Sequence, residues 1–573
     1  MKKVLMLLLL SAFLKVSTAC TNFLVTKSVS GGCGNLISYS ADSHVLYGAL
    51  YHYPAAEHPE GSFREVYDWD SGKFMGKIPE IRHTFNVVGN MNEHQVTIAE
   101  TTYGGLSGLQ SQDGAIIDYG SMIYIALQRS KTAREAIKIM AELAENYGYA
   151  SEGESFSIAD KNEVWIMEVI GKGNFEKGMV WVAQRVPDGY ICAHANQARI
   201  TTFDYQKTNK FDDPKAKTFN SKDVVSFAVE HNFYKGSVKD FSFSDVYNPV
   251  DFEGARFCEI RVWAFFAAAD PDNFGQNAAY WDYAKGNVIR KKAYTKDSCQ
   301  TKDNFAKNRL PLWIKPKNFV TTHGLMNQMR NHLEGTELDM SKDFGAGAFN
   351  CPYRFRPLTF KVGGKEYVNE RATATQQTGW VFVAQMRDWM PDYCGGIFWF
   401  GTDDAANTVF APFYSSMTKI PEEYSEKNGS MIEWSDNSSF WVNNLIANFA
   451  YSRYRLIHPE IEKVQQKQEK EFIFRTSEID REALKKDSTE AVKFLTEFSC
   501  STASDLVKSR KELFTKLFMK FMDGNCKESD ENLNLIDNGN GCGIPKVKFP
   551  GYGENWEEEV VKHTGEKLLY KTN

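Results

Sequence analysis

The segments Cys20-Thr21-Asn22-Phe23-Leu24-Val25 and Asn35-Leu36-Ile37-Ser38-Tyr39-Ser40-Ala41-Asp42-Ser43 stand on either side of Gly31-Gly32-Cys33-Gly34. Polar and apolar residues alternate in the first segment, as in a half-buried strand, and the second has the pattern of a returning strand. The glycines between them are typical of a turn. The sequence therefore predicts an antiparallel hairpin whose second strand brings Asp42 back toward Cys20.

Residues 1–19 have the features of an export leader. Lys2-Lys3 are positively charged, Val4 to Leu14 is apolar, and Ser17-Thr18-Ala19 are the small residues of a signal-peptidase site. Cleavage after Ala19 would place the Cys20 thiol beside a free α-amine, whose reference pKa of about 7.7–8.0 suits a general base near neutral pH. Cys20 would then provide both nucleophile and base.

Two other interpretations of Cys20 stay open on these residues alone. Ser17-Thr18-Ala19-Cys20 is a tolerable though poor lipobox, in which Cys20 would be a lipid anchor. A lipidated, N-acylated cysteine has neither a free thiol nor a free amine, so an anchor cannot also be the nucleophile. Alternatively, Cys20 is only a buried or disulfide-bonded cysteine near the cleavage site.

The Cys-Thr-x-x-Leu-Val opening and the Asp42-Ser43 pair resemble the dipeptidase A family of N-terminal nucleophile (Ntn) cysteine peptidases. The choloylglycine hydrolases of the same superfamily are a more distant resemblance. Further segments resemble the first family in the same order along the chain, namely Met91–Gly105, Ala193–Ile200, His332–Thr336 and Ser439–Asn444. Several ordered motifs over residues 20–470 make the resemblance specific.

The resemblance implies an α+β fold, the αββα four-layer sandwich of Ntn hydrolases. We expect a leader at 1–19, a catalytic domain with insertions at 20–435 and a mainly helical C-terminal extension at 436–573. It also implies hydrolysis of the amide bond of dipeptides or short peptides through a thioester, without a metal or organic cofactor.

The resemblance assigns roles to individual residues. Asp42 matches the aspartate that orients the α-amine of the nucleophile, and Asn196 matches the asparagine that binds the oxyanion. Thr102 stands where choloylglycine hydrolases have a second oxyanion donor, so its hydroxyl or a backbone N–H would serve. Arg256 resembles the active-site arginine of the family, with Arg261 as a rival for that place.

Three further residues bear on substrate and activation. Both related groups commonly have an arginine three residues before the aspartate, and this chain has Tyr39 there, which leaves thiol activation more dependent on the α-amine and on Arg256. Glu100 and Glu168 lie on otherwise apolar strands. Either is a candidate for binding the substrate's ammonium group, and the alternative is a buried ion pair.

Composition limits the classes of partner. The 573-residue chain is 42% hydrophobic and has a net charge of −6 without a basic run, which argues against nucleic acid or an anionic membrane surface. No apolar segment after the leader is long enough to cross a membrane. We expect no metal site, and we expect Cys500, Cys526 and Cys542, which cluster in a polar tail, to be the best candidates for disulfide pairing. A homo-oligomer stays open.

Residue patterns predict several elements. They indicate hairpins over 155–169 and 179–194, a helix over 132–147 and core strands at 378–384 and 395–400. Beyond residue 435 they indicate a helix over 441–455, a charged segment over 460–474, and a long amphipathic helix over 480–522 with an interruption near Ser501.

The sequence therefore favours an exported dipeptidase, periplasmic or extracellular. One alternative is an amidase of the same superfamily acting on bile-salt-like or acyl-amino substrates. The other is a non-catalytic lipoprotein of the outer membrane that uses Cys20 only as an anchor.

Overall fold

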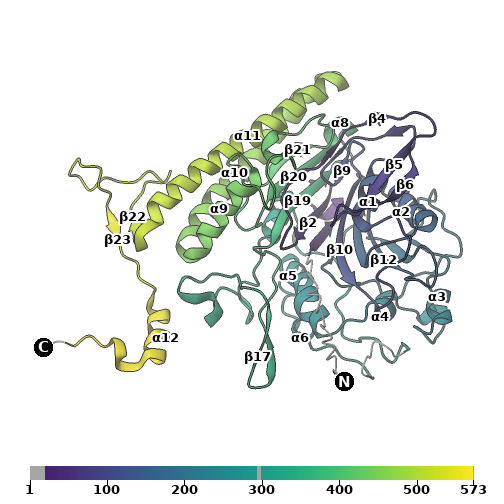
Figure 1. Cartoon of the computed structure of the whole chain (residues 1–573), viewed down its shortest axis with the longest axis horizontal. Helices are drawn as coiled ribbons and strands as arrows, with labels where there is room; N and C mark the ends of the chain where they lie inside the picture. The colour runs from purple at the N-terminus through teal and green to yellow at the C-terminus, as the bar shows by residue number, and fades with distance from the viewer. Residues whose placement is uncertain (1–19, 293–298, 572–573) are drawn as a thin grey trace, which may run out of the picture.

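The computed structural model describes residues 20–292 and 299–571, so the predicted leader lies outside the described residues. Two antiparallel sheets lie at the centre of this part of the chain (Figure 1). The seven-stranded sheet has the order β16 (Trp313–Ile314), β14 (Ile191–His194), β1 (Thr21–Val25), β2 (Asn35–Asp42), β19 (Thr378–Met386), β20 (Gly396–Thr402) and β21 (Ala411–Tyr414). The eight-stranded sheet has the order β15 (Thr218–Asn220), β13 (Met179–Arg185), β12 (Val164–Gly171), β11 (Gly153–Ala159), β10 (Thr97–Gly104), β9 (Met91–Asn92), β8 (Val87–Val88) and β3 (His52–Tyr53).

The remaining strands form small pairs outside the two sheets. They are β4 (Ala56–Glu57) with β7 (His83–Thr84), β5 (Phe63–Tyr67) with β6 (Phe74–Pro79), β17 (Thr359–Val362) with β18 (Lys365–Val368), and β22 (Cys526–Lys527) with β23 (Val547–Lys548). The α-helices are α1 (Tyr119–Leu127), α2 (Ala133–Tyr147), α3 (Ser226–Glu230), α4 (Phe243–Tyr247), α5 (Ile260–Ala269), α6 (Ala278–Ala284), α7 (Thr322–Gln328), α8 (Asp392–Gly395), α9 (Ser439–Ser452), α10 (Tyr454–Ala483), α11 (Ser488–Phe521) and α12 (Glu554–Thr564).

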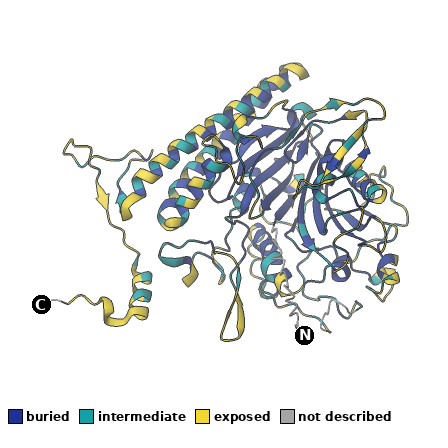
Figure 2. Cartoon of the chain, in the orientation of Figure 1, coloured by how far each residue is buried: buried dark blue, intermediate teal, exposed yellow. Residues whose placement is uncertain are grey.

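Alternation along the strands divides the interior into layers. In β12, Trp165 and Met167 pack into the core shared with α1 and α2, whereas Val164 and Ile166 pack into the core shared with the other sheet. Because successive side chains of a strand point to opposite faces, each strand supplies both cores. The sheets contact each other through β1, β2, β10 and β11, and α7, α9, α10 and α11 pack on the seven-stranded sheet. Figure 2 shows the buried residues concentrated in the two sheets.

The predicted N-terminal hairpin is confirmed. β1 pairs with β2 in antiparallel register, with Thr21 opposite Ser40. Gly34 in the turn has φ of +87°, and a Cβ there would lie 2.1 Å from the carbonyl oxygen of Met386. Only glycine fits this position, both in conformation and in space. The hairpin places the end of β2 beside Cys20.

The predicted helix and two of the strand predictions are also confirmed. Thr132 caps α2 by accepting a hydrogen bond from the Glu135 N–H. β11 and β12 form the hairpin expected over 155–169, and β19 pairs with β20 in the seven-stranded sheet.

The predicted hairpin over 179–194 is wrong. β13 pairs with β12 and β15, whereas β14 pairs with β1 and β16 in the other sheet. The turn at Pro187-Asp188-Gly189 therefore carries the chain from one sheet to the other. Local residue patterns show that two strands exist, but the partner of each is chosen by contacts distant in sequence. This crossing brings the residues after β14 next to Cys20.

The helices after residue 435 pack on the sheet. Residues of α10 and α11, such as Phe472 and Leu495, belong to the same core as the strands. The predicted interruption at Ser501 is wrong, because α11 is continuous and the Ser501 hydroxyl donates to the Phe498 carbonyl. The chain instead breaks before α11, where Asp487 accepts hydrogen bonds from Thr489 and Glu490.

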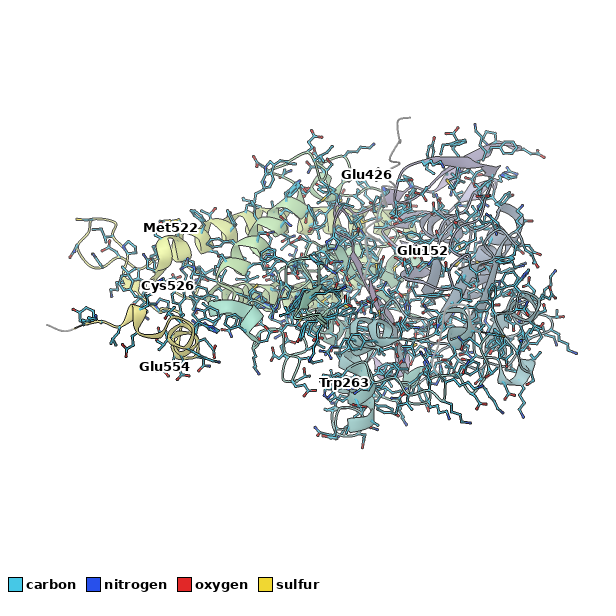
Figure 3. All side chains as sticks on the ribbon, turned by 60° about the horizontal axis from the view of Figure 1, so that its bottom comes forward. Glu152, Trp263, Glu426, Met522, Cys526 and Glu554 are labelled. Carbon is cyan, nitrogen blue, oxygen red and sulfur yellow. The ribbon has the colours of Figure 1, made fainter. Side chains whose placement is uncertain are left out.

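The last segments extend away from the sheets. Cys526 and Glu554 lie toward one end of the molecule, well away from Glu152 (Figure 3), and much of this region is exposed (Figure 2). Disulfide pairing of Cys500, Cys526 and Cys542 is not found, since all three are free thiols. They lie on α11, on β22 and in an exposed loop, respectively. Among the described helices, none is both long and apolar enough to span a membrane.

Candidate active site

Cys20 lies at the start of β1 and lines a cavity of about 440 Å³. It is only 5% exposed. Its sulfur lies 3.4 Å from the Tyr39 hydroxyl, which in turn donates to Glu100 Oε1 at 2.5 Å. A tyrosine hydroxyl has a single proton, and Glu100 accepts it, so the thiol donates to the Tyr39 oxygen. A continuous line of hydrogen bonds therefore leads from the thiol to a buried carboxylate.

A second buried glutamate accompanies Glu100. Burial and the neighbouring Glu100 raise the pKa of Glu154 well above its usual range. Burial raises the pKa of Glu100 as well, but the Tyr39 hydrogen bond opposes that rise. Two adjacent buried carboxyl groups do not both ionise near neutral pH. Glu154 thus keeps its proton, and the negative charge rests on Glu100.

Asp42 lines the same cavity as Cys20, and its carboxylate is fixed by three neighbours. Arg371 donates to Oδ2 at 2.5 Å, Thr378 to Oδ1 at 2.7 Å and Ser40 to Oδ2 at 3.1 Å. Arg371 balances the charge of Asp42 and removes the main cost of burying it. The position of Asp42 is therefore set by β2 and β19 together.

Asn196 is joined to Cys20 by Arg261. Nη2 of Arg261 donates to Asn196 Oδ1 at 2.9 Å, and Nη1 donates to the Cys20 carbonyl at 2.6 Å and the Thr21 hydroxyl at 2.8 Å. Asn196 has φ of 60°, a left-handed conformation that asparagine tolerates better than most residues. Arg261 lies on α5, just after one turn of π-helix at 254–259, a feature that is frequent at functional sites.

Thr102 also lies beside Asn196, but its hydroxyl is already engaged. Oγ1 donates to Glu154 Oε1 at 2.9 Å, and the Thr102 carbonyl accepts from Asn196 Nδ2 at 2.6 Å. Because the hydroxyl proton points to Glu154, a backbone N–H is better suited than Oγ1 to donate to an oxyanion near Asn196.

Arg256 is placed away from Cys20. It forms a bidentate ion pair with Glu370, at 2.5 and 2.9 Å, and donates to the Lys285 carbonyl at 3.0 Å. The rival residue Arg261 is the arginine that the structure brings to Cys20 and Asn196. Burial lowers the pKa of Arg261 to about 10.

Glu168 lines neither the Cys20 cavity nor the cavity next to it. Its carboxylate accepts from the backbone N–H groups of Arg199 and Ile200, at 2.5 and 2.9 Å. Its observed contacts fix the segment that follows Asn196. Burial raises the pKa of Glu168 to about 7.

The walls of the Cys20 cavity are acidic and aromatic. The acidic residues are Asp42, Asp70 and Glu100, and the aromatic ones are Tyr39, Tyr51, Trp69, Tyr119, Tyr124 and Trp380. Among the described residues that line this cavity, none is basic. Burial, Glu100 and Asp42 together raise the pKa of the Cys20 thiol well above its usual range, while the Tyr39 hydrogen bond lowers it.

A second cavity of about 660 Å³ adjoins the first at Thr102. It is lined by Asn196 and by three arginines, Arg261, Arg356 and Arg371. Thr102 therefore lies where an acidic cavity adjoins one that contains an arginine cluster, and Asn196, which donates to the Thr102 carbonyl, lines the second cavity beside it.

Sequence reasoning did not find Glu154, Arg371 or the aromatic wall. Glu154 carries the same signal as Glu100 and Glu168, a glutamate in a buried strand. Arg371 gave no local signal, because it lies in a loop and reaches Asp42 only through the tertiary fold.

Comparison with known proteins relates the chain to a peptidase family. Residues 19–467 match the model of Peptidase family C69. A probable dipeptidase of Latilactobacillus sakei is 22% identical over 456 residues, covering 76% of this chain and 82% of that protein. Probable dipeptidase B of Streptococcus pyogenes serotype M1 is 22% identical over 453 residues, covering 75% and 79% respectively. The dipeptidase of Bifidobacterium longum (strain NCC 2705) is 24% identical over 344 residues, covering 60% and 55%.

The family match thus spans well over half of the chain and begins immediately before Cys20. The chain belongs to peptidase family C69, a family of cysteine-type peptidases.

Proposed function

We propose that this peptidase is an exported dipeptidase whose nucleophile is Cys20, exposed as the N-terminal residue by removal of the leader. The observation that carries the proposal is the buried Cys20 thiol in an acidic cavity, hydrogen-bonded toward Glu100 and linked through Arg261 to Asn196. The relatives named dipeptidase support the choice of substrate. The two sheets with their covering helices support the αββα sandwich of Ntn hydrolases as the fold.

In the proposed reaction, the α-amine of Cys20 takes the thiol proton, and the thiolate attacks the carbonyl carbon of the scissile amide. Asn196 Nδ2 and a backbone N–H stabilise the oxyanion, as donors of this kind do in acyl transfer. The α-amine of Cys20 then gives a proton to the leaving amine, and a thioester forms. Water cleaves the thioester, releasing the acid and restoring the thiol.

Tyr39 gives the thiol a second route for its proton. When the thiol proton passes to the Tyr39 oxygen and the Tyr39 proton passes to Glu100, the thiolate accepts a hydrogen bond from Tyr39 and Glu100 becomes neutral. Charge and protons balance in this exchange. It compensates for the absence of the arginine that related families commonly have at this position.

Glu100 and Asp70 are the proposed binding groups for the substrate's α-ammonium. Glu100 is buried at the cavity wall, accepts from the Tyr39 hydroxyl at Oε1, and is hydrogen-bonded to the neighbouring Glu154 carboxyl. Asp70 is exposed at the same cavity and accepts from the Tyr119 hydroxyl at 2.9 Å. A cationic group entering here meets only acidic, aromatic and neutral walls, which favours a free N-terminus over an acylated one.

The buried position of Cys20 argues against a lipid anchor. An anchored cysteine must reach a membrane surface with its acyl chains, whereas the Cys20 sulfur faces Tyr39 inside the protein. Export is proposed from the leader pattern alone.

The test is hydrolysis of Phe-Ala by protein recovered from its export route, together with its intact mass. We expect a chain that starts at unmodified Cys20 and releases phenylalanine, with far slower turnover of N-acetyl-Phe-Ala. Cys20→Ala abolishes turnover, while Cys33→Ala, which alters a half-buried thiol in the β1–β2 turn, retains it within about threefold. A lipidated Cys20, or an active Cys20→Ala variant, would overturn the proposal.

A further inference from the structure

The second cavity contains an unusual grouping of positive charge. Arg356 and Arg371 both line it. Burial lowers the pKa of the nearby His44, and the charges of Arg356 and Arg371 lower it further. Burial and the adjacent Arg371 lower the pKa of Arg356 itself to about 10. Asp42 is the carboxylate next to this group, and its Oδ2 is paired with Arg371.

Arg356 has no such partner. Its guanidinium donates to Gln377 Oε1, and the Gln377 side chain reaches the Asp42 carbonyl at 3.5 Å. Within residues 20–292 and 299–571, no carboxylate oxygen lies within 4.0 Å of its nitrogens. The side chain is exposed at the cavity, so an incoming anion can reach it.

The acidic residues that line this cavity are Glu152, Asp251 and Glu253. Glu152 is adjacent to Gly104 at the end of β10, and Asp251 accepts from the Gly254 N–H at the start of the π-helical turn. Arg356 instead lies with Gln377 beside Asp42. Glu152 and Asp251 thus have their neighbours at β10 and at the π-helical turn, whereas Arg356 lies on the β2–β19 side of the site.

We propose that Arg356, assisted by Arg371, binds the C-terminal carboxylate of the substrate. This inference rests on the proposed function and extends it. The acidic cavity with Glu100 receives the ammonium of the first residue, and Arg356 receives the carboxylate of the second residue. Thr102 lies where the two cavities adjoin, with Asn196 beside it. A planar guanidinium suits a carboxylate because it donates two parallel hydrogen bonds. Binding both charged termini of the substrate restricts the enzyme to dipeptides, because a longer peptide has a neutral amide where Arg356 needs a carboxylate.

The test compares Phe-Ala with Phe-Ala amide, which differ only in the C-terminal charge. A hydrogen bond to a charged group corresponds to a factor of about 10 to 150 in binding, so we expect the wild type to prefer the free acid in kcat/KM by about that factor. Arg356→Met lowers kcat/KM for the free acid by a similar factor and leaves that for the amide within about threefold. Arg356→Lys keeps the positive charge but lacks the planar guanidinium that donates two parallel hydrogen bonds. It recovers part of the preference for the free acid.

Arg82→Met is the matched control, because the Arg82 side chain is 91% exposed and lies outside both cavities. It keeps the wild-type preference. Equal turnover of acid and amide by the wild type, or an equal loss of both in Arg356→Met, would overturn the carboxylate site while leaving dipeptidase activity in place. Failure of the wild type to cleave either compound would overturn the proposed function and this inference together. The amide serves as an internal check that the variant is folded.

Discussion

Replacing Tyr39 with phenylalanine removes one oxygen atom from the line of hydrogen bonds between Cys20 and Glu100. The thiolate loses the hydroxyl that would stabilise it, and Glu100 Oε1 loses the donor at 2.5 Å. Glu100 and Asp42 still raise the pKa of the thiol, with nothing from Tyr39 to oppose them. The ring itself is retained, so its edge contacts with Trp380 and Phe382 persist.

The magnitude follows from the kind of bond removed. A hydrogen bond to a charged group contributes about 1.5–3 kcal/mol, which corresponds to a thiol pKa higher by about 1–2 units. At a fixed pH below the thiol pKa, the fraction of thiolate then falls about 10- to 150-fold. Leaving Glu100 Oε1 unpaired costs a further 1–3 kcal/mol or so of folding free energy.

The assay is the rate at which iodoacetamide alkylates Cys20, followed by peptide mass between pH 7 and 9, beside kcat/KM for Phe-Ala. Both rates should fall about 10- to 150-fold in Tyr39→Phe, after a thermal melt has shown that the variant is folded at the assay temperature. Tyr234→Phe is the control, because Tyr234 is also buried and donates to the Ser237 carbonyl at 3.0 Å. Alkylation of Cys20 in Tyr39→Phe within threefold of the wild-type rate would refute the role of Tyr39.

Two other predictions concern the oxyanion and the pH dependence of stability. Asn196→Ala should lower kcat/KM for Phe-Ala by about 10²–10³, as loss of an oxyanion donor does. Thr102→Val should lower it no more than about threefold, because the Thr102 hydroxyl donates to Glu154. Equal losses in the two variants would make the Thr102 hydroxyl an oxyanion donor as well. Glu168, with a pKa raised from 4.5 to about 7, binds its proton more tightly in the folded state, so its contribution to stability is full below about pH 4.5 and is lost as the pH rises through 7. At about 1.4 kcal/mol per pKa unit, the loss of stability is about 3 kcal/mol. Urea unfolding at pH 4.5 and pH 8 should show that the difference in unfolding free energy between wild type and Glu168→Gln changes by this amount. Parallel pH profiles of the two proteins would contradict the prediction.

Local patterns predicted the elements that depend on neighbouring residues. The β1–β2 hairpin follows from alternation and from the glycines of its turn, and α2 follows from apolar spacing with a threonine cap. The strand pair over 179–194 was wrong, because the two strands are correct but their partners lie in different sheets. Alternation shows that a residue belongs to a strand and which face it uses, but it carries no information on the partner strand.

The same division applies to the candidate site. The family motifs assigned Cys20, Asp42 and Asn196 to one site, because each residue stands at a fixed position within a short motif. The sequence left open whether Arg256 or Arg261 contacts Cys20, because the two lie close together on one helical segment. In the structure Arg261 donates to the Cys20 carbonyl, whereas Arg256 pairs with Glu370.

By itself the sequence indicated the family, predicted Cys20 as the nucleophile and predicted the hairpin that follows it, because these depend on residue identity and local spacing. Only the tertiary structure decided the surroundings of that thiol. These are the pairing of Asp42 with Arg371, the raised pKa values of Glu100 and Glu154, and the position of an acidic cavity beside one with arginines. The physical reason is that pKa and binding depend on burial and on charges within a few ångströms, and those neighbours come from strands and loops far apart in the chain.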